Sequence, residues 1–506
     1  MIILKEMKKQ ILALVLLIIS TQVFSQFSVF SEYFPYNKKT EVYPIISNSD
    51  KGLPILFISG KNVKVYYFAD DFTFQREINI KRSIVDSREY LGSYMVDNSL
   101  VIMFSDKKMN LISQLLVNLS TGVSKELLVY KHEHDQKYLA SWEVLDSLFV
   151  LSIVENSSVL IVRKFFGLGK TATSNFNIGS NHMDNSSLVS RSSLSDIFDN
   201  QGGKPQKIDP SIPVSLKTAS AKNKIYLVDD KIIITLDDNG NATKLITLNL
   251  IDNSHDIANF AYVNYQPQQP LPTSYNSFIY DNTIFQISIN KNEIGMRIVS
   301  LGDTNRVALF QTKKDADIAF LNSTLSLRNE KEGFLFGNPV VTEIRTTRKF
   351  LKMASKMSPA ISVFSNHLNY QILMGGVMDI HQSAGVMSNT VVSSGGDMMV
   401  SPNGSLAMPD PDYNFPTNYS FTSYASRMSA SFSSNIDTSS YCHSDSFISK
   451  YTYDYIIKYA NYMPGRFGLV TVFKIKGDYY LGYYSYSNMT YNIEWFKNID
   501  DYLVQH

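Results

Sequence analysis

The 506-residue sequence contains a single cysteine and only two tryptophans. Because Cys442 has no second cysteine to pair with, an intramolecular disulfide is excluded, and packing alone must hold the fold together. An excess of charge of one sign is also missing, since 47 basic residues nearly balance 46 acidic residues. The chain therefore has no net charge whose electrostatic field would attract nucleic acid or an anionic membrane. We expect neither as a partner.

The common catalytic motifs are absent as well. The sequence has no G-x-S-x-G elbow, no Walker loop and no H-E-x-x-H motif. The usual signatures of serine hydrolases, nucleotide-binding proteins and zincins are therefore missing. We expect no cofactor and no assigned catalytic residue, and we favour a protein that is not an enzyme.

An export leader is predicted at residues 1–25. Three lysines precede an apolar run over residues 11–19, and Val23 and Ser25 stand at positions −3 and −1 of a cleavage site. We expect cleavage after Ser25, which makes Gln26 the first residue of the mature chain. The alternative is an uncleaved anchor, but the run is shorter than the ~20 residues that a spanning helix needs.

Export sets the expected location and charge of the mature chain. Cleavage removes three lysines and one glutamate, so the formal net charge falls from +1 to −1. No second apolar stretch of spanning length follows. We expect an exported protein without an integral membrane span, which is periplasmic, bound at the outer surface or secreted.

Short β-forming runs separated by turn residues are the main structural signal. Residues 224–250 read KIYLVDDKIIITLDDNGNATKLITLNL, with turn residues at Asp229-Asp230 and Asn239-Gly240. Asp, Asn and Gly tolerate the positive φ of tight hairpins, and Ile, Val, Thr and Tyr favour strands. This stretch predicts an antiparallel meander of three strands.

The same pattern recurs along most of the chain. It is found again at residues 94–102, 142–150 and 278–285, and in weaker form at residues 55–68 and 469–484. The starts of these units are separated by roughly 40 to 80 residues, which fits one four-stranded sheet per unit plus insertions.

Repeated meanders of this kind resemble the sequence pattern of β-propellers. The resemblance covers most of residues 40–497 and rests on no family-specific motif. It implies an all-β propeller of about seven four-stranded antiparallel blades over residues 26–497, with a tail at residues 498–506. Tandem β-sandwich domains are the alternative. We expect a strand near residues 41–46 to close the ring by pairing with one near residues 492–496.

Two segments interrupt the pattern and are predicted to be long loop insertions. Residues 174–214 are rich in Ser, Asn, Asp and Gly, and residues 355–449 are rich in Met, Ser and Gly. The second segment also contains a candidate metal site. Met374, Met378 and His381 have the spacing of one helical face, and thioether and imidazole ligands suit Cu(I). The alternative is that these methionines fill gaps in the core.

Four other groups of residues are weaker candidates. The pair His132 and His134 could bind zinc, residues 237–241 resemble part of a calcium loop, and residues 442–445 contain the residue types of a nucleophile and its base. For the histidine pair we favour the tip of a hairpin, and for residues 237–241 we favour an ordinary turn. Residues 442–445 are neighbours in sequence, which does not by itself assemble a catalytic site. The tyrosines of residues 479–491, with Trp495, could bind sugars or a partner, but strand packing is favoured.

Three functions remain open from the sequence. The first is an exported, non-catalytic scaffold or binding protein of the bacterial envelope, whose partner is an envelope or extracellular protein. The second is a propeller that binds or cleaves a glycan with carboxylates at the mouth of its channel. The third is copper handling through Met374, Met378 and His381.

Overall fold

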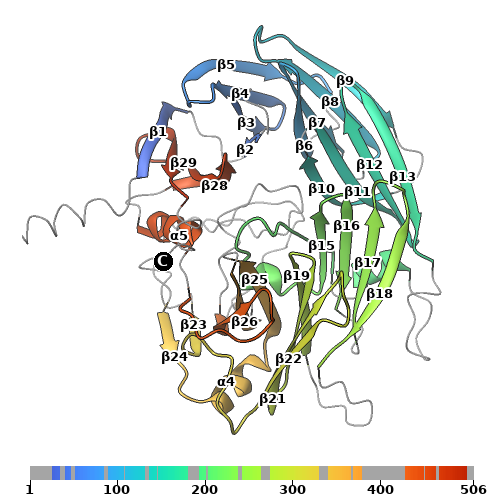
Figure 1. The fold of residues 1–506 in the computed structure, drawn as a ribbon. Coiled ribbons are helices and arrows are strands. Elements are labelled where there is room, and N and C mark those ends of the chain that lie inside the picture. The colour runs from blue at the N-terminus through green and yellow to red at the C-terminus, as the bar shows by residue number, and fades with distance from the viewer. Residues whose placement is uncertain are drawn as a thin grey trace, which may run out of the picture.

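The computed structural model describes residues 26–34, 40–46, 52–84, 89–106, 109–131, 136–144, 146–179, 193–200, 203–237, 242–263, 274–329, 340–365, 368–378, 428–448, 451–462 and 467–498. These residues form seven sheets of four or five strands, arranged around a common axis as the blades of a β-propeller (Figure 1). The predicted fold class is confirmed.

Blades 1 to 3 each contain four antiparallel strands and run outward in chain order. Blade 1 consists of β2 (Glu41–Pro44), β3 (Leu53–Ser59), β4 (Asn62–Phe68) and β5 (Phe74–Lys81). Blade 2 consists of β6 (Glu89–Val96), β7 (Ser99–Ser105), β8 (Leu111–Asn118) and β9 (Ser124–Lys131). Blade 3 consists of β10 (Gln136–Val144), β11 (Ser147–Val154), β12 (Val159–Phe166) and β13 (Lys170–Asn177).

Blades 4 and 5 follow the same order, with one extra strand in blade 4. That strand, β14 (Gln206–Ile208), pairs in parallel with β15 at the inner edge of the sheet. The rest of blade 4 consists of β15 (Asn223–Val228), β16 (Lys231–Leu236), β17 (Ala242–Asn249) and β18 (His255–Ala261). Blade 5 consists of β19 (Ser274–Tyr280), β20 (Thr283–Ile289), β21 (Glu293–Ser300) and β22 (Val307–Lys313).

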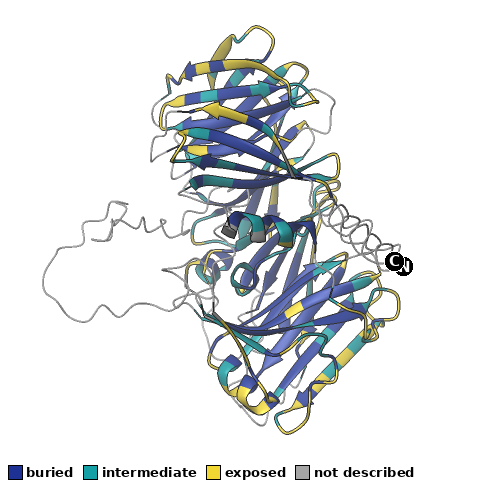
Figure 2. Ribbon diagram, turned by 90° about the vertical axis from the view of Figure 1, so that its left-hand side faces the viewer, coloured by how far each residue is buried: buried dark blue, intermediate teal, exposed yellow. Residues whose placement is uncertain are grey.

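In blades 6 and 7 the outer strands come from earlier parts of the chain. Blade 6 runs outward through β25 (Ser358–Ser365), β26 (Asn369–Met378), β27 (Met428–Asp437), β23 (Ser326–Asn329) and β24 (Val340–Glu343). Blade 7 runs outward through β28 (Phe467–Ile475), β29 (Asp478–Ser485), β30 (Thr490–Phe496) and β1 (Gln26–Tyr33). Figure 2 shows exposed residues mainly on outer strands and turns.

The predicted strand pairs are present, and the predicted turn at Asn239-Gly240 lies outside the described residues. In residues 224–250, Val228 pairs with Lys231 across a two-residue turn in which Asp229 has φ 51°, and β16 pairs with β17. Blades 2 and 5 have the same turn, with positive φ at Asp97 and at Asp281. Aspartate tolerates this conformation better than most residues, so the aspartates fix where each chain reversal occurs.

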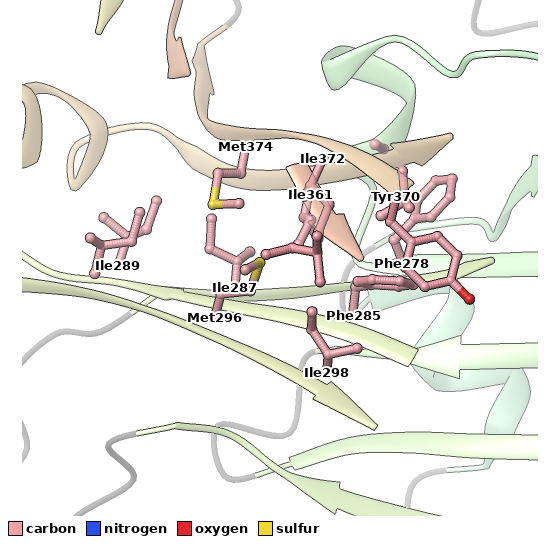
Figure 3. Close-up of a cluster of buried hydrophobic side chains, with 14 of the residues drawn as sticks. Phe278, Phe285, Ile287, Ile289, Met296, Ile298, Ile361, Tyr370, Ile372 and Met374 are labelled. Atoms are coloured by element: carbon pink, nitrogen blue, oxygen red, sulfur yellow. The ribbon is translucent and has the colours of Figure 1, made fainter. Parts of the chain in front are cut away.

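Neighbouring blades share apolar clusters, which fill the seams of the ring. One cluster joins blades 7 and 1, one joins blades 1 and 2, one joins blades 2 and 3, and one joins blades 3 and 4. The largest cluster joins blades 4, 5 and 6 (Figure 3). Each sheet thereby buries both faces, which it could not do alone.

The seam between blades 6 and 7 is built differently. Helix α5 (Thr452–Tyr462) packs on blade 7 in a cluster with Val472, Tyr479 and Leu481. Tyr451, which directly precedes this helix, packs edge-to-face on Phe364 of blade 6 at 4.7 Å between ring centroids. The segment formed by Tyr451 and helix α5 therefore contacts both blades.

The other three helices of the described ranges are short. Helix α2 (Leu194–Asn200) follows blade 3, α3 (Leu216–Ala219) lies between β14 and β15, and α4 (Thr347–Ala354) precedes β25. Helix α3 packs against the inner strands of blade 6 through Leu216, which contacts Ala360 and Val377. In the part of the chain that the structure describes, no helix is long and apolar enough to cross a membrane.

The ring closes through β1, which is not the predicted closing strand. β1 pairs antiparallel with β30, from Gln26 opposite Phe496 to Tyr33 opposite Thr490. The strand at residues 41–44 instead pairs with β3 and is the inner strand of blade 1. The prediction was wrong because the strand that follows the predicted cleavage site supplies the outer edge of the last blade.

The expected bounds of both insertions are also corrected. Strands β25, β26 and β27 lie within residues 355–449 and form the inner part of blade 6, so only residues 379–427 separate β26 from β27. Residues 174–214 include the end of β13, helix α2 and strand β14. Residues 379–427 and 180–192 lie outside the described residues.

The closing strand gives a test of the ring. Phe30 of β1 is 8% exposed and packs edge-to-face on Phe68 of blade 1 at 4.7 Å between centroids. We expect Phe30→Ala to lower the free energy of unfolding by about 3 kcal/mol, because a buried aromatic side chain is lost. Tyr33 of the same strand is 62% exposed, so Tyr33→Ala is the control and is expected to cost under about 0.5 kcal/mol. Equal values for the two variants in urea titrations would contradict this closure.

Candidate functional site

Charged and hydroxyl side chains gather on the inner strands of blades 1, 2 and 3 and beside β14. We call this set the axial cluster. It consists of Glu41, Tyr43, Tyr90, Ser93, Tyr138, Ser141, Trp142, Glu143, Lys204 and Lys207. Figure 1 shows β6, β10 and β15 on the axial side of their blades. These groups are therefore candidates for contact with a ligand.

Glu41 and Tyr43 belong to the inner strand of blade 1. The Tyr43 hydroxyl donates to Glu41 Oε2 at 2.8 Å, and the Tyr43 ring lies on that of Tyr90 of blade 2, with centroids 4.1 Å apart. Glu41 is exposed to solvent, yet protein surrounds its carboxyl, and burial raises its pKa. Partial desolvation of this kind favours the neutral form of a carboxyl more than full exposure does.

Glu143 at the end of β10 joins blade 3 to blade 2. Its Oε1 accepts from the Tyr90 hydroxyl at 2.8 Å, from Ser93 N at 2.8 Å and from Ser93 Oγ at 3.3 Å. Burial raises the pKa of Glu143, while the bonds from Tyr90 and Ser93 and the nearby Lys207 act in the opposite direction. One carboxyl oxygen is thus held by the protein.

The approach of blade 2 to blade 3 at this point requires a glycine. Gly92 has φ 148°, and a Cβ there would lie 2.4 Å from Leu148 Cδ1. A side chain at this position would strain the backbone and force the Leu148 side chain to move.

An internal repeat positions these groups. In β6 the residues Tyr90-Leu91-Gly92-Ser93 contain a bulge after Tyr90, and in β10 the residues Tyr138-Leu139-Ala140-Ser141 contain one after Tyr138. In both strands the tyrosine hydroxyl and the serine Oγ are 2.9 Å apart. The bulge brings two side chains three residues apart onto one side, which a regular strand would not do.

Two lysines of residues 203–209 lie against the inner strand of blade 3. Lys207 Nζ donates to Ser141 O at 2.7 Å and lies 5.8 Å from the centroid of the Trp142 ring. Lys204 Nζ lies 5.1 Å from the centroid of the Tyr138 ring. Desolvation lowers the pKa of Lys204 to about 8, and it also lowers that of Lys207, which Asp209 and Glu143 partly offset.

Trp142 has an unused donor. The residue is 6% exposed, and its Nε1 is fully buried with no hydrogen-bond acceptor among the described residues. A buried N–H without an acceptor costs free energy, and this one belongs to the ring that lies near the Lys207 ammonium.

A second polar network lies between blades 4 and 5 and is closed to solvent. Asp237 Oδ2 accepts from Lys224 Nζ at 3.2 Å and from Ser277 N at 2.8 Å, and its Oδ1 accepts from Thr243 and Tyr262, both at 2.8 Å. Lys224 is 0% exposed. Asp237, considered above as a calcium ligand, is therefore fully used within the protein, and residues 238–241 lie outside the described residues.

The predicted copper ligands do not share a helical face. Met374 and Met378 lie on strand β26, and His381 lies outside the described residues. Figure 3 shows Met374 directed at Ile287 and Met296 of blade 5. Met374 is 0% exposed, and Met378 packs against the same cluster. Both thioethers fill the seam between blades, so the helical spacing was an incorrect assumption for this segment.

The other weak candidates are placed as follows. Cys442 is exposed, and its amide and thiol contact Ser440. The His443 ring contacts Asn322 Oδ1 at 2.8 Å and Asp445 Oδ1 at 3.6 Å. His132 and His134 lie outside the described residues. Within the described ranges, no three His, Cys, Asp or Glu side chains are grouped so that they could hold a metal ion.

Most of the C-terminal tyrosines pack inside blade 7. Tyr479 and Tyr491 are 0% exposed and Tyr484 is 1% exposed, while Trp495 Nε1 donates to Asp478 Oδ2 at 3.0 Å. Strand packing, favoured from the sequence, describes these three tyrosines. The axial cluster was missed, although the repeated YLGS and YLAS segments were visible in the sequence.

Comparisons with known proteins identify no family. No family model matches the chain, and no curated protein matches it. The WD40 domain of SCAP from fission yeast aligns with a TM-score of 0.29 and 7% identity, over 94% of this chain and 98% of that chain. A cobalt-substituted apocarotenoid oxygenase from Synechocystis aligns with a TM-score of 0.28 and 7% identity, over 55% of this chain and 63% of the oxygenase. This chain thus spans less than two thirds of the oxygenase, and function must be argued from its own residues.

The network at Asp237 gives a stability test. Asp237→Ala leaves the Lys224 ammonium buried without its carboxylate, and we expect a loss of about 3–5 kcal/mol in the free energy of unfolding. Adding Lys224→Met should recover part of that loss, because the unpaired charge is removed. Asp252→Ala, in an exposed turn of the same blade, is the control and should cost about 1 kcal/mol or less. A double variant no more stable than Asp237→Ala would contradict this role.

The desolvated Lys204 gives a test by titration. We expect its ammonium to lose its proton near pH 8, against about 10.4 for an ordinary lysine. Since the unfolded chain then holds more protons between these values, this residue makes stability rise with pH across that window. NMR of ¹³C-methylated lysines measures the pKa, and Lys204→Met identifies the signal. A midpoint near 10.4 would show that Lys204 is fully solvated.

Proposed function

We propose that this protein is an exported, non-catalytic binding protein of the bacterial envelope that holds its ligand or partner at the axial cluster. The observation that supports this most is the location of Glu41, Glu143, Lys204 and Lys207. All four lie at the inner edges of blades or in the segment at β14, where partial desolvation acts against their charged forms although Glu41, Glu143 and Lys204 keep exposed surface. Titratable side chains whose charged forms are disfavoured lower the stability of the fold. Their presence at one place makes them candidates for binding a ligand.

Binding is favoured over catalysis by how the carboxyls are held. Glu143 Oε1 already accepts three hydrogen bonds from Tyr90 and Ser93, and Glu41 accepts one from Tyr43. Such bonds fix the orientation of each carboxyl, which suits a rigid recognition surface. Propellers also provide a rigid frame on which loops and inner edges can be displayed.

A glycan-binding or glycan-cleaving propeller is the second candidate. It is favoured by two carboxyls with raised pKa, Glu41 and Glu143, which bond to Tyr43 and Tyr90, whose rings are in tilted contact. Glycoside hydrolysis uses a pair of carboxyl groups, of which the acid has a raised pKa. Release of reducing sugar from oligosaccharides would distinguish cleavage from binding.

The exported location is proposed from the predicted leader at residues 1–25, with its lysines, apolar run and cleavage site. Cleavage after Ser25 would leave strand β1, which begins at Gln26, intact. We expect expression in a Gram-negative host to give a mature chain that begins at Gln26, as read by N-terminal sequencing. Replacing Leu14 and Leu17 by Arg within the apolar run should block export and leave the leader attached, and recovery of the full-length chain from wild-type cells would contradict export.

The binding role is tested by thermal and urea unfolding of residues 26–506 with a panel of envelope peptides and oligosaccharides. A ligand at about 100 times its Kd should stabilise the folded chain by about 2.7 kcal/mol. We expect the double variant Glu41→Gln and Glu143→Gln to lose that stabilisation. Glu77→Gln, on the outer strand β5, is the matched control and should keep it. Stabilisation that survives in the double variant would place the site elsewhere.

A further inference from the structure

Residues 203–219 run between distant blades, and we call them the central strap. They contain strand β14, the turn that follows it and helix α3. Near its start the central strap lies on the inner strand of blade 3, where Lys207 Nζ donates to Ser141 O at 2.7 Å. β14 also pairs in parallel with β15. The first half of the central strap is therefore fixed to blades 3 and 4.

The second half of the central strap reaches blades 6 and 7. Ile212 packs against the apolar cluster that helix α5 forms with blade 7. Val214 O accepts from Ser362 Oγ of blade 6 at 2.6 Å, and Leu216 packs on Ala360 of the same blade. Within one short stretch, the central strap therefore contacts both sides of the seam between blades 6 and 7.

The order of the blades shows that this path crosses the ring. Blades follow one another in chain order around the axis, as the shared clusters of neighbouring blades show. In a ring of seven, blades 4 and 5 separate blade 3 from blade 6, and blades 1 and 2 separate it from blade 7. Blade 3 therefore lies opposite the seam between blades 6 and 7, and a segment that contacts both must cross the middle of the ring.

The seam that the central strap reaches differs from the other six. Among the described residues, each of those six has an apolar cluster with side chains from both of its blades, whereas the cluster around α5 contains none from blade 6. The α5 segment meets blade 6 through the rings of Tyr451 and Phe364. Ile212 and Leu216 add apolar packing on the two sides of this seam. The central strap thus supplies contacts that neighbouring blades supply elsewhere.

We propose that the central strap holds the seam between blades 6 and 7 closed, and that its detachment opens this seam while the other blades stay folded. Segments with few buried apolar contacts open at a lower free energy than a complete core does. The central strap also contains Pro205, Pro210 and Pro213. Proline limits the conformations open to a detached chain, so it favours the attached state. This inference requires no ligand at the axial cluster.

The test is amide hydrogen exchange of residues 26–506, measured by mass spectrometry at α5, β25 and β7. In the wild-type chain we expect α5 and β25 to exchange together and faster than β7 of blade 2, because the seam opens without unfolding of the ring. Ile212→Ala should speed exchange at α5 and β25 about tenfold, since its packing on the seam is lost. Ile212→Val removes one methyl group, retains the fold more readily and should speed exchange there about threefold.

Ile197→Ala is the matched control. Ile197 of α2 is also a partly buried isoleucine, but it packs against the cluster between blades 3 and 4. Its loss lowers global stability and should leave exchange at α5 and β25 unchanged, because its packing persists when the other seam opens. Exchange of α5 and β25 no faster than that of β7, no acceleration by Ile212→Ala, or equal acceleration by Ile197→Ala would each overturn this role of the central strap.

Discussion

Burial of both faces of each small sheet is the constraint on which the fold depends. A four-stranded antiparallel sheet has two faces. Each apolar face is shielded from water only when another element packs on it. Here the neighbouring blade does so at most seams, through apolar clusters that contain residues of two or three blades. The protein has no disulfide to hold the ends of the ring together. The apolar cluster at every seam is therefore shielded from water only when the ring is closed.

Polar groups enter this apolar ring in two different ways. Between blades 4 and 5, Asp237 and Lys224 neutralise each other and are surrounded by hydroxyl and amide partners, so the network specifies how the two blades fit. On the axial side, Lys204 and the Trp142 indole lack such partners in the described residues, and Glu41 and Glu143 remain open to solvent. The first arrangement is satisfied within the fold, whereas the second has unused capacity for an external molecule.

The local parts of the fold could be predicted from the sequence, and the long-range parts could not. Aspartates at positive φ mark the hairpins, so the blade pattern and the approximate number of blades followed from turn chemistry. The closing strand at residues 26–33 could not be assigned, because pairing across the whole chain leaves no local signal. The inner strands of blade 6 were mistaken for a loop because they are rich in Ser, Gly and Met. Gly375 shows the reason for such residues, since a Cβ there would lie 2.0 Å from Ala430 O of the neighbouring strand.

The antiparallel pairing of β1 with β30 bears on when this protein can fold. Ser31 Oγ donates to Asn492 Oδ1, a contact between residues 461 positions apart in the chain. During synthesis the first strand has no partner until almost the whole polypeptide has been made, and contacts of such long range form slowly. A nascent chain would therefore keep the edge of its last blade unpaired until both ends of the sequence are available, so ring closure is expected to be a late step of folding.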